Sequence, residues 1–230
     1  MKKRIKINGV IIFICVIAMM LFPNVFLRMS FNKIDILTGI LGLELMFFGL
    51  LLRVSSRGYK SELSVGGNNL VRTGPYSLVR NPMYLGICCI ALGIIMVLFQ
   101  WWTLAVFGIF FALRYLTLIR VEEKGLLEKF GHRYSEYQKD VPRILPRLNT
   151  RLNKDLLNCL PLKLSWIKKE LNSILIIVPG VLGIDMWKKF ILCENDLALP
   201  YFLILSWIIC ALIVLAAVLV KNYEGYPKQK

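Results

Sequence analysis

Residues 83–119 read MYLGICCIALGIIMVLFQWWTLAVFGIFFALRYLTLI and decide the fold. They form two apolar runs, Met83–Phe99 and Trp101–Ile119, each close to the roughly 20 residues that a helix needs to cross a bilayer. Gln100 alone separates the runs, so we predict a tight antiparallel hairpin with its tryptophans at one membrane interface. Both polar flanks of the hairpin must then emerge close together on the opposite face.

The rest of the chain is also strongly apolar. Hydrophobic residues make up 57% of the sequence, and a soluble domain of this size is rarely so apolar. One run contains Pro179-Gly180 and is predicted either to span with a kink or to be re-entrant. We therefore predict an all-α integral membrane protein with about six transmembrane helices. The runs outside the hairpin are Val10–Phe26, Ile34–Leu52, Leu171–Trp187 and Leu197–Val220.

The charge distribution predicts the topology. The net charge of +15 would by itself fit a nucleic-acid partner, but the positive residues lie in short stretches between apolar runs. That pattern is typical of membrane topology and of attraction to anionic lipids. With six spans, 24 of the 29 Lys and Arg residues fall on one side and four on the other, so both termini are predicted to be cytosolic. The basic start lacks a small-residue cleavage site, which favours a retained anchor over a signal peptide.

Three parts are predicted along the chain. Residues 1–53 form a two-helix hairpin, and 54–149 hold a polar loop, the central hairpin and a charged cytosolic lid. Residues 150–230 form an amphipathic connector, interrupted at Pro161, and two further apolar runs. The six cysteines include no C-x-x-C pair and the chain has one histidine, so no metal site is predicted.

The first flank of the hairpin contains a helix start. In Asn81-Pro82, Asn is a favoured N-cap and Pro a favoured first helical residue. The free N–H groups and positive dipole end of such a helix bind anions. Arg72 and Arg80 add cationic donors for a carboxylate.

The second flank carries carboxylates and aromatic rings. Glu122 and Glu123 fall at the bilayer boundary, where they suit a cationic ligand or ribose hydroxyls, and Tyr134 and Tyr137 offer aromatic faces for a heterocycle or a sulfonium. Together the flanks suit a ligand with a carboxylate, a positive centre and an aromatic base, as in S-adenosylmethionine. The alternative from composition alone is a basic, aromatic rim that anchors the helices at lipid headgroups.

The two flanks together carry a recognisable signature. The pattern R-N-P-M-Y-L-G, a helical hairpin, then E-E-x-x-L-x-x-x-F-G-x-x-Y-x-x-Y-x-x-x-V-P-R-x-x-P resembles the isoprenylcysteine carboxyl methyltransferase and phospholipid methyltransferase superfamily, over roughly residues 60–148. The resemblance implies S-adenosylmethionine as cofactor, held where the flanks converge in a cytosolic pocket. The positions that it assigns to cofactor contact are Asn68, Asn69, Leu70, Val71, Tyr76, Asn81, Pro82, Met83, Tyr84 and Glu122.

Two positions depart from the family pattern. Asn81 stands where the eukaryotic pattern has a histidine, so the side chain can hydrogen-bond but cannot titrate. Family enzymes that act on prenylated proteins have a substrate-contacting arginine about four residues before the first glutamate of the pair, and this chain has Leu118 there. This departure disfavours prenyl-protein substrates, although Arg114 and Arg120 lie nearby.

The reaction implied is methyl transfer to a lipophilic acceptor, either an isoprenylcysteine-like carboxylate or a lipid headgroup. A carboxylate acceptor needs no base at neutral pH, whereas an amine must lose a proton, for which Glu123 and Glu122 are the candidates. His132 is expected at the surface of the lid. Arg114 lies inside a span, where charges are usually paired or line a cavity. It is predicted to pair with Glu44 or, as a catalytic residue, to face the substrate path.

Two other classes of function stay open from the sequence. Membrane sterol and enone reductases have a similar R-x-P-x-Y-x-G and F-G-x-x-Y-x-x-Y layout and use NADPH, although the glutamate pair suits a cationic cofactor better than a polyphosphate. A non-catalytic membrane scaffold that keeps the fold is the other alternative.

Overall fold

The computed structural model describes residues 21–28, 33–64, 67–146 and 160–192, the last four of these through their backbone alone. The first predicted span lies mostly, and the sixth wholly, outside these residues. Everything described is helix, turn or loop, apart from one isolated bridge between Leu27 and Phe99. The helices are α2 (Pro23–Phe26), α3 (Lys33–Leu63), α4 (Pro75–Leu78), α5 (Pro82–Leu98), α6 (Trp102–Phe130), α7 (His132–Asp140) and α9 (Leu164–Leu192).

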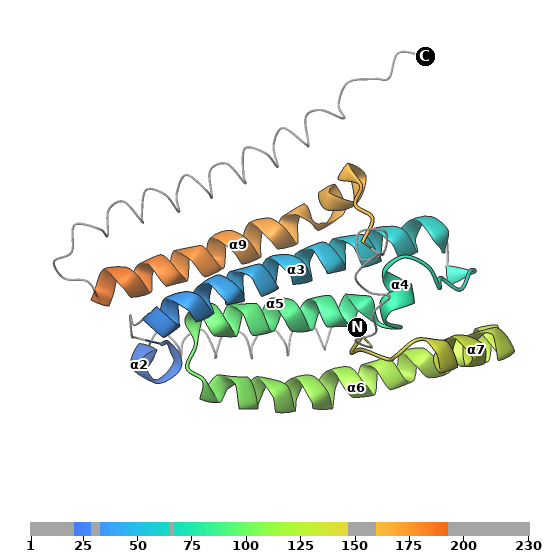
Figure 1. Ribbon diagram of the computed structural model, residues 1–230, viewed down its shortest axis with the longest axis horizontal. Helices are drawn as coiled ribbons and strands as arrows, with labels where there is room; N and C mark the ends of the chain where they lie inside the picture. Colours follow the sequence, from blue (N-terminus) through green and yellow to red (C-terminus); the bar gives the residue numbers. More distant parts are fainter. Residues whose placement is uncertain (1–20, 29–32, 65–66, 147–159, 193–230) are drawn as a thin grey trace, which may run out of the picture.

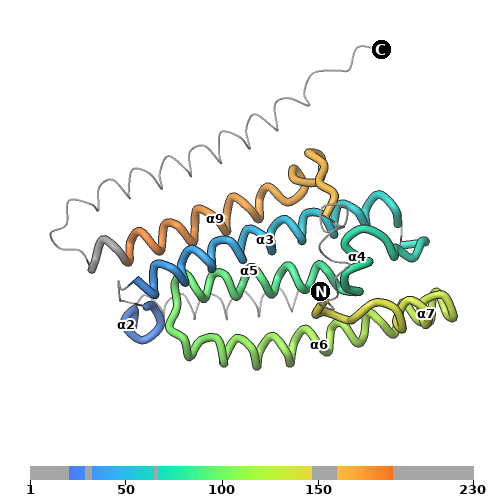
Figure 2. Tube along the Cα trace, in the orientation of Figure 1, coloured from blue at the N-terminus to red at the C-terminus, as the bar shows by residue number. Residues whose placement is uncertain are grey.

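Four long helices lie side by side in the order α9, α3, α5 and α6 (Figures 1 and 2). Helix α3 packs along α5, α9 contacts both, and α6 contacts α5. Successive helices run in opposite directions, so α3 and α6 end where α5 and α9 begin. We call this end of the bundle the site end; α4 and α7 also lie there. We call the opposite end, where the chain turns from α5 into α6, the turn end.

The described helices fit a membrane protein. Lys33–Leu63, Trp102–Phe130 and Leu164–Lys188 are each long and apolar enough to cross a bilayer. Pro82–Leu98 is apolar but shorter, roughly 25 Å at 1.5 Å per residue against a hydrocarbon core of about 30 Å. For the described residues, an all-helical fold with several membrane-length helices is therefore confirmed, while a total of six spans stays a prediction.

Helix α5 and the start of α6 lie within one residue of the predicted bounds, whereas α6 continues past Ile119 to Phe130. Two other elements also differ from the sequence-based prediction. Helix α3 continues past Leu52 to Leu63, through the predicted end of the first part of the chain. The predicted connector and fifth span join, because α9 begins at Leu164 and continues through Pro179. Within a long helix a proline removes a single backbone hydrogen bond, which membrane helices tolerate. A spanning-length helix thus replaces the re-entrant alternative.

Close packing of α3 on α5 depends on two glycine pairs. Gly42 lies against Gly93, and Gly49 against Gly86. A methyl group at Gly49 would approach the Gly86 carbonyl oxygen to 2.7 Å, and one at Gly42 would approach that of Gly93 to 2.9 Å. Small residues allow such backbone contact between membrane helices, where van der Waals packing stabilises the pair.

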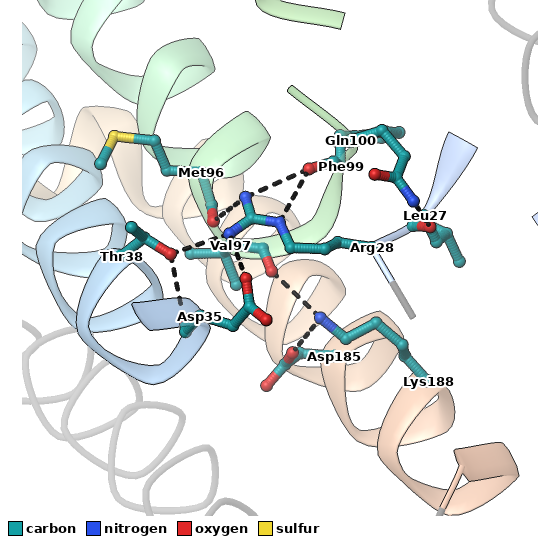
Figure 3. Close-up of polar contacts among 10 residues, drawn as sticks. All are labelled: Leu27, Arg28, Asp35, Thr38, Met96, Val97, Phe99, Gln100, Asp185 and Lys188. Atoms are coloured by element: carbon teal, nitrogen blue, oxygen red, sulfur yellow. Dashed lines mark hydrogen bonds and ion pairs between the residues drawn. The ribbon is translucent and has the colours of Figure 1, made fainter. Parts of the chain in front are cut away.

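At the turn end, two buried cations cap the short helix α5 (Figure 3). The Arg28 guanidinium donates to the carbonyl oxygens of Met96 at 2.9 Å and Phe99 at 3.2 Å. The Lys188 ammonium donates to the carbonyl oxygen of Val97 at 3.1 Å. These carbonyls have no partner within their own helix, so the cations satisfy them inside the bundle. Their carboxylate partners are Asp35 at 3.2 Å and Asp185 at 3.0 Å.

Candidate active site

The first turn of α5 lies at the centre of the site end. Asn81 occupies the N-cap position and Pro82 the first helical position, as predicted. The Asn81 side chain, however, makes no capping bond. Its amide nitrogen instead donates to Glu123 Oε1 at 3.2 Å and to the Arg143 carbonyl oxygen at 3.1 Å. Asn81 therefore joins α5 to α6 and to the chain that follows α7.

Glu123 is enclosed, with 4% of its surface exposed. Arg143 approaches Glu123 Oε2 through Nε at 3.0 Å and Nη2 at 2.9 Å. Arg80 Nε lies 3.3 Å from Oε1, within ion-pair distance but without a hydrogen bond. With the Asn81 amide, these groups engage both oxygens of the carboxylate. Glu123 was predicted as a candidate base, and that role stays a prediction.

Glu122 points to a different set of partners. Its carboxylate accepts a hydrogen bond from Tyr84 of α5 at 2.8 Å and lies 3.8 Å from the Lys60 ammonium of α3. The side chain stays 43% exposed, and the Tyr84 ring packs edge-on to Tyr115 at 5.6 Å between centroids. Three helices thus meet at one accessible carboxylate, and the predicted convergence of the two flanks is confirmed.

The predicted aromatic residues of the lid are buried. Tyr137 donates to the Tyr76 carbonyl oxygen at 2.6 Å, and Tyr76 in turn donates to the Ser56 carbonyl oxygen at 3.4 Å. Burial raises the pKa of Tyr134 to about 12 and raises the pKa of Tyr76 and Tyr137 above the usual range. The hydroxyls therefore stay protonated and donate. The first contact seats α7 on α4, and the second seats α4 on α3. Contact of Tyr134 and Tyr137 with a cofactor stays a prediction.

The loop before α4 lies against the α6–α7 junction. Asn68 accepts from the Lys129 ammonium at 3.4 Å, and the Asn69 amide donates to the Leu63 carbonyl oxygen at 3.2 Å. Arg72 donates to the Arg133 carbonyl oxygen. Both asparagines are exposed, whereas Leu70 and Val71 are half-buried, as is Met83 on α5. The predicted cofactor positions of this loop are thus brought to the site end.

The predicted intramembrane charges do not join this group. Arg114 and Glu44 are exposed on their helices, and the described residues contain no ion pair between them. Arg114 lies eight residues before Glu122 on α6, about 12 Å along a helix. Its predicted catalytic role, or a place along the substrate path, stays a prediction. His132 is at the surface as predicted, with 85% of its side chain exposed.

Two residues of the site were not singled out from the sequence. Lys60 belongs to the part of α3 that continues beyond the predicted span, so no local pattern indicated it. Arg143 belongs to the V-P-R segment of the signature, and its place after a turn-forming proline was the available signal. Because both act through long-range contacts, only the folded arrangement of helices identifies them.

Comparison with known proteins assigns the family of this region. Residues 37–133 match the phospholipid methyltransferase family. This segment is similar to that family of S-adenosylmethionine-dependent membrane methyltransferases. It contains α5, α6, most of α3 and both glutamates described above.

Two relatives of known name are similar to the chain. The cobalt-zinc-cadmium resistance protein CzcN of Cupriavidus metallidurans is 36% identical over 117 residues, which cover 48% of this chain and 49% of that protein. The protein-S-isoprenylcysteine O-methyltransferase of Saccharomyces cerevisiae is 32% identical over 136 residues, 55% of this chain and 56% of the yeast protein. The chain thus spans about half the length of these relatives. No solved structure matches at the same level of significance.

Proposed function

We propose that this protein is a membrane-embedded, S-adenosylmethionine-dependent methyltransferase that acts on a lipophilic acceptor. The observation that carries the proposal is the Glu122 carboxylate. It belongs to the family-matching segment, remains accessible and has Tyr84 at 2.8 Å and Lys60 at 3.8 Å. Such a carboxylate attracts a cationic cofactor, whereas it would repel the phosphates of a nicotinamide dinucleotide. The reductase alternative is therefore disfavoured.

The residues at the site end fit the proposed cofactor by their chemistry. Glu122 offers an anionic acceptor for a positive centre or for ribose hydroxyls. The exposed amides of Asn68 and Asn69 offer donors and acceptors for an adenine edge or a carboxylate. Lys60 offers a cation beside Glu122. Arg80 is not available in this arrangement, because its side chain is 9% exposed and lies against Glu123.

The acceptor is proposed to approach from the bilayer along α6. Half-buried Phe107, Phe111 and Tyr115 repeat every four residues on one helix face, with Phe111 stacked on Tyr115 at 4.5 Å. Tyr84 continues this aromatic row to Glu122. An apolar chain packed along the row would bring its polar head to the carboxylate. Leu118, at the position where prenyl-protein enzymes of the family have an arginine, favours a different acceptor from the one that the yeast relative's name specifies.

The contacts of the glutamates favour an acceptor that needs no base. When bound, the cofactor supplies a methyl group that is already activated by a positively charged sulfur. Glu123 is engaged by Arg80, Arg143 and Asn81, and Glu122 accepts from Tyr84. Glu123 is therefore not placed to take a proton from an ammonium group, and Glu122 is assigned to the cofactor in this proposal. The protein then contributes orientation and exclusion of water rather than proton transfer.

Ligand binding to purified full-length protein tests the proposal. We expect isothermal titration calorimetry to detect S-adenosylmethionine binding and no NADPH binding. Glu122→Gln removes the charge but keeps the shape, and should weaken binding by about tenfold to 100-fold, the range for a hydrogen bond to a charged group.

Glu128→Gln is the matched control for this measurement. Glu128 lies on the same helix, with its side chain 68% exposed, and pairs only loosely with Lys124 at 4.0 Å. The Glu128→Gln variant should bind S-adenosylmethionine as tightly as the unmodified protein. NADPH binding without S-adenosylmethionine binding would favour the reductase, and binding of neither would favour the scaffold.

A further inference from the structure

We propose that Glu123 is a positioning residue and not the catalytic base. Together with Arg80 and Arg143 it latches residues 141–143, which we call the strap, onto the first turn of α5. The latch fixes α6 against α5 and thereby holds Glu122 at the cofactor site. This inference rests on the proposed function, because it assigns a role within that same site.

The strap is bonded to the start of α5 through its backbone. The Arg80 amide donates to the Pro142 carbonyl oxygen at 2.8 Å, and the Asn81 amide donates to the Arg143 carbonyl oxygen at 3.2 Å. The Asn81 side chain adds a third bond, to the same Arg143 oxygen. These bonds occupy N–H groups just before the helix, and they require the strap to stay in place.

Glu123 holds the strap through its side chain. Arg143 belongs to the strap and contacts Glu123 Oε2 through two nitrogens, at 2.9 and 3.0 Å. Arg80 approaches Oε1 at 3.3 Å and also donates to the Gln138 carbonyl oxygen at the end of α7. One enclosed carboxylate therefore links α6, the entry to α5, the end of α7 and the strap.

The position of α6 at this level depends on few buried contacts. In the described structure Ile119 and Glu123 are its two buried residues, while about half of its apolar side chains, Val121 among them, are exposed. Removing one member of a buried ion cluster leaves the other charges without a partner, which is strongly unfavourable. Loss of the Glu123 charge should therefore loosen both the strap and the end of α6 that carries Glu122.

A base at this position would need a different environment. A general base must reach the proton that it removes and must have a free lone pair. Both oxygens of Glu123 are engaged by Asn81, Arg80 and Arg143, and two cations oppose a single anion. The two roles for Glu123, positioning residue or catalytic base, therefore predict different consequences of the Glu123→Gln substitution.

The test uses full-length Glu123→Gln, Arg143→Gln and the double variant in lipid nanodiscs. Hydrogen–deuterium exchange reports the amides of Arg80 and Asn81 without any ligand. For each single variant we expect exchange at these amides to become about tenfold faster, by loss of one charged hydrogen bond. The double variant should be no faster than the singles, because one latch is broken in each case. The amides of α5 near Gly93 serve as the internal reference.

Kinetics separate the two roles. With S-adenosylmethionine varied, the latch predicts a KM and a Kd about tenfold higher in Glu123→Gln, with kcat at saturation within about threefold. A catalytic base predicts the reverse, with kcat lower by about 100-fold or more and KM unchanged. Arg143→Lys keeps the charge and should restore most of the affinity, which covers the case in which a glutamine variant does not fold.

The outcome for the latch is separable from that for the proposed function. If the unmodified protein binds no S-adenosylmethionine, the proposed function fails, yet faster exchange at Arg80 and Asn81 in Glu123→Gln still supports the latch. Exchange unchanged in both single variants overturns the latch, whatever the cofactor measurement gives. A collapse of kcat with KM unchanged overturns it as well.

Discussion

At the scale of single residues, the adjacent side chains of Glu122 and Glu123 on α6 have different surroundings. Glu122 is accessible and contacts α5 and α3, whereas Glu123 is enclosed and contacts the strap. From the sequence, both glutamates were candidate bases, and the family resemblance assigned Glu122 to cofactor contact. The two glutamates differ in exposure and in their contacts. These differences depend on Lys60 and Arg143, which are distant from them in the sequence. The glutamate pair could thus be predicted from the sequence, but the enclosed, ion-paired surroundings of Glu123 could not.

The buried tyrosines of the lid give a prediction about pH. Burial raises the pKa of Tyr134 to about 12 in the folded protein, while an unfolded tyrosine has a pKa of about 10. A raised pKa means that the folded state keeps its proton more firmly, so this contribution to stability is complete below about pH 10. It is lost as pH rises towards 12. We expect the midpoint of unfolding to fall across that window.

Tyr134→Phe removes the ionisable hydroxyl and keeps the ring. It should flatten the decline in stability, measured by thermal unfolding at several pH values, together with tyrosinate absorbance. The exposed residue His132 offers a control, since His132→Gln should leave the decline unchanged above pH 10. If Tyr134→Phe and the unmodified protein lose stability in parallel, burial of Tyr134 does not control the alkaline transition.

At the scale of elements, local patterns predicted the helices and missed what joins them. The apolar runs and the Asn81-Pro82 start gave α5 and the beginning of α6 within a residue or two. The end of α3 and the start of α9 could not be predicted in this way, because the apolar run ends at the membrane surface. A helix can continue beyond that surface where its polar side chains find partners. Glu170 shows this, since it lies 3.3 Å from Arg53 and also pairs with Arg57.

The glycine contacts between α3 and α5 lead to a prediction about packing. Gly49→Ala would place a methyl group within 2.7–2.9 Å of Gly86, Cys89 and Ile90 atoms. Two of these atoms belong to backbone, which cannot turn away, so the helices must separate. Overpacking of this kind typically destabilises by about 1–3 kcal/mol. Thermal unfolding in detergent should reveal the loss as a lower midpoint.

Gly39→Ala on the same helix is the matched control. A methyl group there meets nothing within 4 Å, and alanine is the better helix former by about 1 kcal/mol. Its midpoint should equal or exceed that of the unmodified protein. Equal losses in the two variants would mean that the close approach of α3 and α5 does not stabilise the bundle.

At the scale of the whole molecule, a family core is braced by a helix from outside it. Residues 37–133 contain the hairpin and both glutamates. Helix α9 follows this segment and is tied to α3 at the site end through Glu170 and to α5 at the turn end through Lys188. Such long-range ion pairs have no local sequence signature. The placement of both termini on the cytosolic side, which the charge asymmetry favours, stays a prediction.

Methyl transfer itself tests the methyltransferase assignment most directly. Full-length protein in nanodiscs of native membrane lipid would be incubated with methyl-labelled S-adenosylmethionine, and the lipid extract analysed for label. We predict label in a lipophilic acceptor, a loss of about tenfold or more at limiting cofactor in Glu122→Gln, and full activity in Glu128→Gln. Label absent from every lipid with the unmodified protein, or equal labelling by Glu122→Gln, would contradict a methyltransferase built around Glu122.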